Sequence, residues 1–297
     1  MSRVPDRHIV RRVDLDEYRR ASHAIWEAMA PGWDARHEYL ELATRPVTER
    51  ILEGLRPLPG ETILELAAGT GVLGLAIAAA LRGQGRVIVS DFSASMVEAA
   101  RRRGAELGLE GVEYRVLDGE RLDLPEASVD GVACRFGFML MADPAAALAE
   151  ARRVLRPGGR IACAVVGPPE GNPWASLPGR VLSEAGHLPP PSPGAPGIHA
   201  LADPERLRGL LVGAGFAEPR IDEVSAAWTF SDDEDFWDFL ERMAGPFAAV
   251  FRRLDAGENA RLRAELSRRL EAYAGNEGIT LPALSLVASA TVAPKGP

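Results

Sequence analysis

Lysine is almost absent from this chain. Of its 34 basic residues, 33 are arginine, and the single lysine, Lys295, lies near the end of the 297 residues. Schiff-base enzymes, P-loop nucleotide hydrolases and dehydrogenases with a catalytic lysine all need a lysine side chain inside the fold. The scarcity of lysine therefore excludes these three classes.

Cysteine is scarce as well, with Cys134 and Cys163 as the two examples. Both lie in apolar, strand-like runs, and neither has a histidine close to it in the sequence. Cysteines in such surroundings are typical of buried free thiols rather than metal ligands. We expect two buried thiols and no metal site.

An excess of positive charge and a long apolar run are also missing. The net charge of −8 argues against nucleic acid as a partner. No apolar run reaches the roughly 18 residues that a membrane span needs, and the first 20 residues are too charged for a signal peptide. We therefore expect a cytoplasmic protein, whose 46% apolar content suffices for a large core.

What the sequence does contain is the stretch 61–74, ETILELAAGTGVLG, which predicts a strand, a turn of small residues and the start of a helix. This unit opens many nucleotide-binding α/β folds, because glycine lets the backbone approach a ligand and the helix start offers free N–H groups. Gly69, Gly71 and Gly74 match the dinucleotide pattern. Glu65 with the turn after it equally matches the S-adenosylmethionine (AdoMet) loop of class I methyltransferases, in which Ala67 replaces a glycine. A tight turn without a ligand is the third interpretation.

From residue 60 onward, predicted strands alternate with predicted helices. Such alternation is typical of a doubly wound, mostly parallel sheet with helices on both faces. A helix over 145–155, closed by Arg156–Gly159, precedes the fifth strand. We expect an α/β fold with seven strands, over residues 62–66, 86–90, 112–117, 129–134, 160–166, 220–230 and 284–292.

The segments outside this sheet predict caps around it. Three helices are expected before residue 56: one that Pro31 and Gly32 break, one over 34–43, and one that Pro46 opens. The Pro/Gly-rich residues 168–200 predict a lid or a long loop. The expected organisation is an N-terminal helical cap (1–58), an α/β core (59–167), a lid insert (168–202), the core continued (203–230), a helical cap insert (231–280), and a last strand with its tail (281–297).

Acidic residues end three successive strands: Glu65, Asp91 and Asp118. Ligands of open α/β sheets lie at the carboxyl ends of the strands. A carboxylate at Asp91 can accept both hydroxyl hydrogens of a ribose, which suits AdoMet and NAD equally. Asp118 distinguishes the two, because its carboxylate and the N–H of Gly119 can together bind the amino edge of an adenine.

Five motifs carry a family resemblance. The chain resembles the class I AdoMet-dependent methyltransferases, and within them the group of the ubiquinone and menaquinone C-methyltransferases. This resemblance implies a Rossmann-like methyltransferase fold and AdoMet as the methyl donor, with S-adenosylhomocysteine (AdoHcy) as its product. The motifs are ILELAAGTG (63–71), VIVSDFSASM (87–96), VLDGERL (116–122), SVDGVACRFG (128–137) and VLRPGGR (154–160).

The resemblance also implies how residues of this chain hold the cofactor. It implies that the methionine part of AdoMet contacts the end of the first strand, the glycine turn and the end of the fourth strand. The ribose and the adenine of AdoMet are expected to bind at the ends of the second and third strands. The implied set is Glu65, Ala67, Gly69, Gly71 and Arg135 for the methionine part, Asp91 for the ribose, and Phe92, Met96, Asp118 and Gly119 for the adenine.

Residues for the methyl acceptor have weaker signals. His37 and His199 are the candidate general bases, although positioning alone can also drive the reaction. Aromatic residues near the fourth strand end and in the caps are candidates for an apolar acceptor pocket. This candidate set is Trp33, Tyr39, Phe136, Phe138 and Trp174.

The sequence thus favours a methyltransferase that acts on a small, hydrophobic or aromatic acceptor at carbon, oxygen or nitrogen. The partner is the acceptor molecule, and a homodimer is an open option for the assembly. Two alternatives stay open: an NAD(P)-dependent oxidoreductase, and an AdoMet-binding regulatory protein without catalysis.

Overall fold

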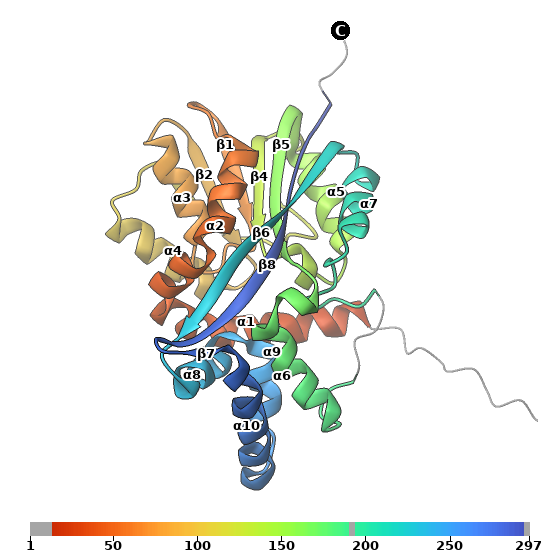
Figure 1. Cartoon of the computed structure of the whole chain (residues 1–297). Coiled ribbons are helices and arrows are strands. Elements are labelled where there is room, and N and C mark those ends of the chain that lie inside the picture. The colour runs from red at the N-terminus through yellow and green to blue at the C-terminus, as the bar shows by residue number, and fades with distance from the viewer. Residues whose placement is uncertain (1–13, 190–193, 294–297) are drawn as a thin grey trace, which may run out of the picture.

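The computed structural model describes residues 14–189 and 194–293, and Lys295 lies outside them. A twisted sheet forms the centre, in the order β3-β2-β1-β4-β5-β8-β6, with a short β7 beside β8 (Figure 1). The predicted α/β fold with a mostly parallel, seven-stranded sheet is confirmed, and β7 is an addition. The strands are β1 (Thr62–Leu66), β2 (Arg86–Asp91), β3 (Val112–Val116), β4 (Val129–Arg135), β5 (Leu155–Val166), β6 (Ala217–Phe230), β7 (Ala274–Gly275) and β8 (Gly278–Thr291).

Helices cover both faces of the sheet because β1, β4 and β5 are apolar on both sides. Strands β1 to β5 pair in parallel. Buried residues of α2 (His37–Leu55), α3 (Val72–Leu81) and α4 (Ala94–Glu106) pack on one face. Those of α5 (Pro144–Val154) and α7 (Pro204–Gly213) pack on the other. Cys134 and Cys163 are buried free thiols in this core, as predicted.

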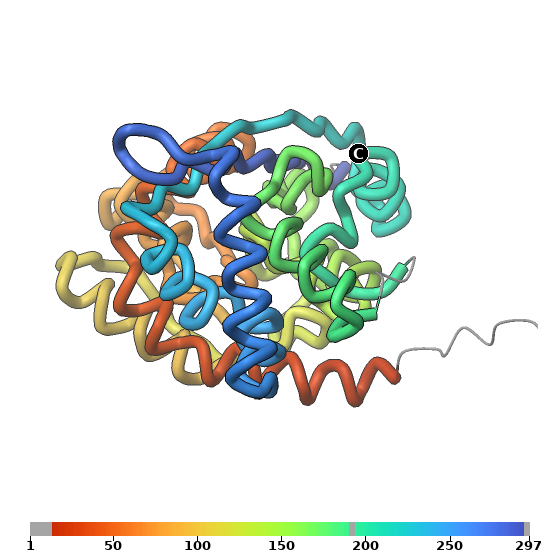
Figure 2. Tube along the Cα trace, turned by 60° about the horizontal axis from the view of Figure 1, so that its bottom comes forward, coloured from red at the N-terminus to blue at the C-terminus, as the bar shows by residue number. Residues whose placement is uncertain are grey.

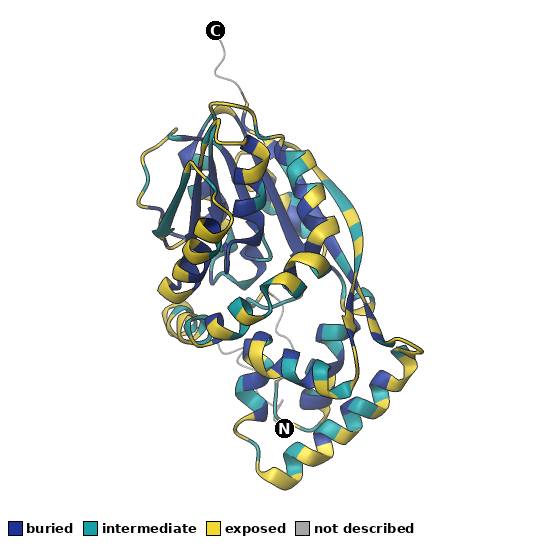
Figure 3. Cartoon of the chain, turned by 90° about the vertical axis from the view of Figure 1, so that its left-hand side faces the viewer, coloured by how far each residue is buried: buried dark blue, intermediate teal, exposed yellow. Residues whose placement is uncertain are grey.

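A two-stranded ribbon projects beyond the parallel strands. Val166, the last residue of β5, pairs with Ser285, whereas β8 begins at Gly278 and continues its pairing with β6 out to Phe230. The projecting part carries a helical cap at the carboxyl edge of the sheet (Figures 1 and 3). The cap consists of α6 (Pro173–Glu184), α8 (Asp233–Met243), α9 (Gly245–Phe251) and α10 (Ala256–Leu270).

The helices before β1 correct one prediction. Residues 14–61 form two helices instead of the three predicted: α1 (Leu15–Ala35) continues through Pro31, and α2 continues through Pro46. Gly32 serves a close approach to α8 instead of a break, since a Cβ on it would lie 2.8 Å from the Cβ of Arg242. Tertiary packing thus outweighs the helix-breaking tendency of proline here. The chain turns at Arg36.

A second prediction, for the Pro-rich segment after β5, was also wrong in part. The segment was predicted as a lid or a long loop, but α6 forms within it. Pro173 stands in the first turn, where its missing N–H costs no hydrogen bond, and Leu177 and Val181 are buried in the cap. Residues 190–193 lie outside the described part of the chain.

In addition, α5 ends at Val154, and Arg156–Gly159 belong to β5. Among the described helices, none combines the length and the apolar character that crossing a membrane requires.

Candidate functional site

Four buried polar atoms mark one edge of the molecule. Within the described residues, these are the buried side-chain nitrogen and oxygen atoms that have no hydrogen-bond partner. An unpartnered buried polar group costs about 1–3 kcal/mol, so each needs an explanation. Two of them stand at the end of β1, and the other two contact residues at the ends of β5 and β6, the edge where ligands of such sheets bind. They are Glu65 Oε2, Thr70 Oγ1, His199 Nε2 and Tyr39 Oη.

The glycine turn after β1 adopts the backbone that its sequence predicts. Gly69 and Gly71 have φ of 55° and 85°, and a Cβ on Gly71 would lie 2.8 Å from the Cβ of Ala100. Ala67 also has a positive φ, 51°, which is strained for a residue with a side chain. Its methyl group fits because residue 137 is a glycine: a Cβ there would lie only 2.5 Å from the Cβ of Ala67.

Glu65 places a buried carboxyl directly below this turn. Its side chain is 1% exposed. Burial raises its pKa to about 8, and the positive charge of Arg135 opposes that shift. Thr70, in the turn itself, is buried with a free hydroxyl oxygen. A carboxyl oxygen and a hydroxyl oxygen without partners are suited to a ligand that carries hydrogen-bond donors, such as the ammonium group of an amino acid.

Asp91 joins the first two loops of the sheet. Its Oδ2 accepts from the N–H of Gly69 at 2.8 Å, and its Oδ1 accepts from the N–H of Ser93 at 2.9 Å. Burial raises its pKa to about 6. Each oxygen keeps a second lone pair, so the carboxylate can still accept from two hydroxyls. The sequence predicted the ligand role but not this bracing of the glycine turn.

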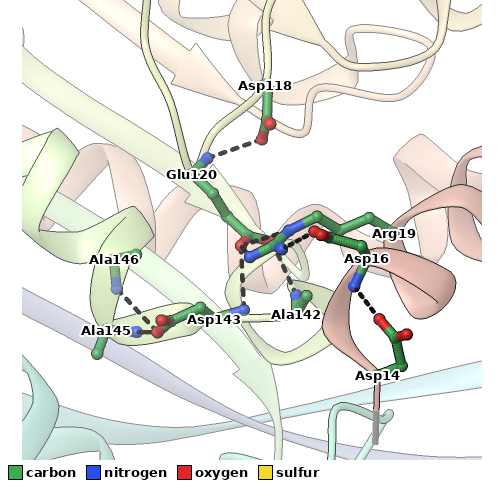
Figure 4. Close-up of polar contacts among 9 residues, drawn as sticks. All are labelled: Asp14, Asp16, Arg19, Asp118, Glu120, Ala142, Asp143, Ala145 and Ala146. Atoms are coloured by element: carbon green, nitrogen blue, oxygen red, sulfur yellow. Dashed lines mark hydrogen bonds and ion pairs between the residues drawn. The ribbon is translucent and has the colours of Figure 1, made fainter.

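The residues assigned to the adenine lie at the next two strand ends. Met96 is buried among α1 residues, and the ring of Phe92 meets the ring of His23 edge-on at 5.3 Å. Asp118 is exposed, and its Oδ1 accepts from the N–H of Glu120 at 2.9 Å (Figure 4). Gly119 lies against Met141, since a Cβ on it would be 2.9 Å from Cε of that methionine.

Helix α1 closes over these loops. Glu27 accepts hydrogen bonds from the hydroxyls of Ser93 and Ser95, and so binds the start of α4. The ring of Trp33 lies against Gly69, with Cε3 3.5 Å from where a Cβ would stand, and its Nε1 donates to the carbonyl of Met243 in the cap. Figure 2, in which the cap faces the viewer, shows α1 in red as it passes the cap.

A second carboxylate holds the other end of α1. Glu120, after β3, accepts from Nε and a terminal nitrogen of Arg19, the latter at 2.6 Å. It also accepts from the N–H groups of Ala142, at 2.8 Å, and Asp143 (Figure 4). Tyr18 donates to the carbonyl of Leu140. Glu120 stands inside the motif VLDGERL but was not predicted as a site residue, and Glu27, which lies in no motif, was not predicted either.

The end of β4 holds a cation and a strained aromatic residue. Arg135 donates to the hydroxyls of Thr44 and Thr48 on α2, and burial lowers its pKa to about 10. Phe136 has φ of 62°, which is rare for a bulky residue and recurs at ligand-binding positions. Phe138, by contrast, is fully buried beneath α5 in the sheet core.

Aromatic residues from distant segments gather beneath the cap. The ring of Tyr39 lies 5.7 Å from that of Trp228, and the ring of Trp174 lies 5.2 Å from that of Trp228. Phe239 of α8 lies 5.2 Å from the same indole. Burial raises the pKa of Tyr39, and its Oη is one of the four unpartnered atoms. Two of the predicted pocket residues thus come together around Trp228, which carries no sequence signal.

The two candidate bases lie in different surroundings. His37 lies where α1 meets α2, in a surface hollow of about 350 Å³ that Arg102 and Arg103 of α4 also line. His199 is half-buried, and its Nδ1 lies 2.9 Å from the carbonyl oxygen of Gly167, the residue after β5. Another surface hollow, of about 660 Å³, lies between residues 120–123 and α5, away from the glycine turn.

Comparisons with known proteins agree on one family. A family model described as a methyltransferase domain matches residues 63–159. A nocamycin O-methyltransferase of Saccharothrix syringae is 31% identical over 235 residues, which are 71% of this chain and 84% of that protein. A ubiquinone/menaquinone biosynthesis C-methyltransferase of Acidiphilium cryptum is 35% identical over 153 residues, which are 51% of this chain. The chain covers only 61% of that relative's length.

The fold has solved counterparts. The crystal structure of a SAM-dependent methyltransferase from Aquifex aeolicus superposes with a TM-score of 0.50 at 16% sequence identity. The match covers 95% of this chain and 100% of the other. At this level of identity the similarity shows a shared fold.

Proposed function

This chain belongs to the class I AdoMet-dependent methyltransferases, and on that premise we propose that it transfers a methyl group from AdoMet to a small, hydrophobic or aromatic acceptor. The observation that carries the proposal is the position of the four unpartnered polar atoms. Of these atoms, we assign those of Glu65 and Thr70 to the cofactor and those of Tyr39 and His199 to the acceptor.

The cofactor fits the residues at the first strand ends. The buried carboxyl of Glu65 and the hydroxyl of Thr70 suit the amino-acid end of AdoMet, and the free lone pairs of Asp91 suit its ribose. Phe92, Met96, Asp118 and Gly119 lie at the next two strand ends, where the adenine would follow. Ala67, Gly69 and Gly71 would support the methionine part, with Arg135 behind it.

The acceptor would occupy the space between the strand ends and the cap. The proposed lining of this space is Tyr39 of α2, Trp174 of α6, Phe136 at the end of β4 and Trp33 of α1. An aromatic surrounding with few polar groups favours an apolar, flat molecule. AdoMet supplies an activated methyl group, so the protein's own task is to align the acceptor with that methyl and to exclude water.

Relatives of the chain leave the acceptor atom open. One curated relative is named a C-methyltransferase and another an O-methyltransferase. Neither name indicates an oxidoreductase or a regulatory protein. Methyl transfer therefore stands as the single proposed activity.

Titration with AdoMet, AdoHcy and NADH tests the cofactor proposal, with native mass spectrometry of the purified protein as the first measurement. We expect bound AdoHcy, or micromolar affinity for AdoMet and AdoHcy, and no binding of NADH. Binding of NADH without AdoMet would refute the proposal.

A further inference from the structure

His199 is held by one ring nitrogen and presents the other. Its Nδ1 lies 2.9 Å from the carbonyl oxygen of Gly167. A carbonyl only accepts, so Nδ1 must carry the hydrogen of the neutral ring. Nε2 is then the nitrogen with a free lone pair. That atom is buried and has no partner among the described residues.

The backbone around His199 fixes this orientation between two strand ends. Gly167 follows β5, and its own N–H donates to the carbonyl of Leu284 on β8. Two residues before His199, the N–H of Gly197 donates to the carbonyl of Met139, which follows β4. Because β4 lies between β1 and β5 and strands are spaced by about 4.8 Å, the end of β5 lies about 10 Å from the end of β1. This spacing suits a group that faces the acceptor and not the cofactor.

The surroundings of His199 favour the neutral form of its ring. Burial lowers the pKa of His199, and the negative charge of Glu170 opposes that effect. A neutral imidazole with a free, buried lone pair is the state that a general base requires. The Nδ1 atom of His37 has a similar contact, with the carbonyl oxygen of Asp34 at 2.8 Å, but His37 lines a surface hollow with Arg102 and Arg103.

We propose that His199 is the general base of the reaction and that the acceptor carries a hydroxyl group, phenolic or enolic, whose proton passes to Nε2. This inference rests on the proposed function. The acceptor O–H bond breaks, and its proton moves to Nε2. The oxygen forms a bond to the methyl carbon while the bond from that carbon to sulfur breaks. The sulfur keeps that electron pair, so the sulfonium becomes the neutral thioether of AdoHcy, and the imidazolium later releases its proton to water.

The carbonyl of Gly167 has a role in this step. When Nε2 gains a proton, both ring nitrogens become donors, and Nδ1–H keeps its bond to that carbonyl. The ring therefore does not need to rotate during the transfer.

The first measurement uses the wild-type protein. Nitrogen-15 NMR of its histidine side chains at pH 7.5, with the His199 signals assigned through His199→Gln, reports which ring nitrogen carries the hydrogen. We expect hydrogen on Nδ1 and a pKa below that of a free histidine. A ring with hydrogen on Nε2 would overturn the proposal without any knowledge of the acceptor.

The second measurement uses matched probes: 2-naphthol, 2-naphthylamine and 2-methoxynaphthalene, together with phenol and catechol as smaller hydroxyl probes. AdoHcy formation is followed by mass spectrometry. We expect turnover with hydroxyl probes, none with the ether, and a kcat that falls as pH drops through the pKa of His199. His199→Gln should lower kcat about 100-fold or more and leave AdoMet affinity unchanged. His187→Gln changes a cap histidine that pairs with Glu258, and it serves as the matched control with normal kcat.

The outcomes separate the two proposals. Absence of AdoMet binding would refute the proposed function itself. AdoMet binding without turnover of any hydroxyl probe would refute the hydroxyl assignment alone. Equal kcat in His199→Gln and the wild type would refute the role of His199. So would a His37→Gln variant in which kcat no longer falls at low pH. Thermal unfolding of each variant shows whether a lost kcat reflects lost folding.

Discussion

The two sides of the site are built in different ways. On the cofactor side, each predicted residue lies within a few positions of a strand end, and nearby backbone hydrogen bonds help to place several of them, although Arg135 is also held by Thr44 and Thr48 of α2. Asp91 is an example, since it bonds to the N–H of Ser93 two residues further on. On the acceptor side, Tyr39 and Trp228 lie 189 positions apart in the chain and meet only through the cap. The cofactor side is therefore local in sequence, and the acceptor side exists only in the folded molecule.

The largest expected effect tests the cofactor side. In Asp91→Ala, the ribose loses its acceptor and the N–H of Gly69 loses its partner. Two lost charge-assisted hydrogen bonds cost about 3 kcal/mol, or about 100-fold in AdoMet affinity. Because the pKa of Asp91 is about 6, wild-type affinity should also weaken as pH falls through 6, and the variant should lose that dependence. Calorimetry measures both. An altered acceptor KM with normal AdoMet affinity would contradict the division into two sides.

Glu65 should link cofactor binding to proton release. Its pKa of about 8 leaves most of the carboxyl protonated at pH 7, whereas the ammonium group of AdoMet favours the ionised form. Lowering the pKa by two units requires about 2.7 kcal/mol of interaction. AdoMet binding at pH 7 should therefore release close to one proton, and the release should vanish above pH 9, where the carboxyl is already ionised. Binding enthalpies in buffers of different ionisation enthalpy give the number. Glu65→Gln should release none, and an unchanged release in that variant would assign the proton to another group.

Ala67 and Gly137 should behave as a coupled pair. Gly137→Ala forces its new methyl group against Ala67, and overpacking of this kind costs about 2 kcal/mol of unfolding free energy. Ala67→Gly removes the positive-φ strain and opens space. The double variant should recover part of the loss, since Cys134 Sγ, 2.7 Å from the same Cβ position, still restricts the site. Urea unfolding of the wild type, the two single variants and the double variant gives the coupling energy. Additive effects would show that the two residues are independent.

The smallest expected effect tests the acceptor side. Tyr39→Phe removes a buried hydroxyl that has no partner. The apo protein should therefore gain about 1 kcal/mol in unfolding free energy, with AdoMet affinity unchanged. Thermal unfolding measures the first quantity and calorimetry the second. Trp174→Phe, which changes an indole in the same cluster that donates to Asn172, should instead lower stability. A change in AdoMet affinity in Tyr39→Phe would show that the cofactor side and the acceptor side are coupled, which contradicts their separation.

This contrast explains how much the sequence could predict. The strand ends, the glycine turn and the three acids follow from patterns a few residues long, so the sheet was predicted nearly strand for strand. Pro31 and Pro46 misled the prediction because packing against α8 and the sheet holds both helices together. Glu27 and Trp228 were missed for another reason. Their partners, Ser93 and Tyr39, lie far away in the chain, and no local pattern encodes such pairs.

Trp33 stands between the two sides, with its ring on Gly69 and its N–H bonded to Met243 of the cap. We expect a ligand that settles on the glycine turn to displace this ring, whose N–H group is bonded to the cap. We therefore expect a compulsory order of addition, in which the methyl donor enters first and the acceptor second. In steady-state kinetics, AdoHcy should then compete with AdoMet but show noncompetitive inhibition toward the acceptor.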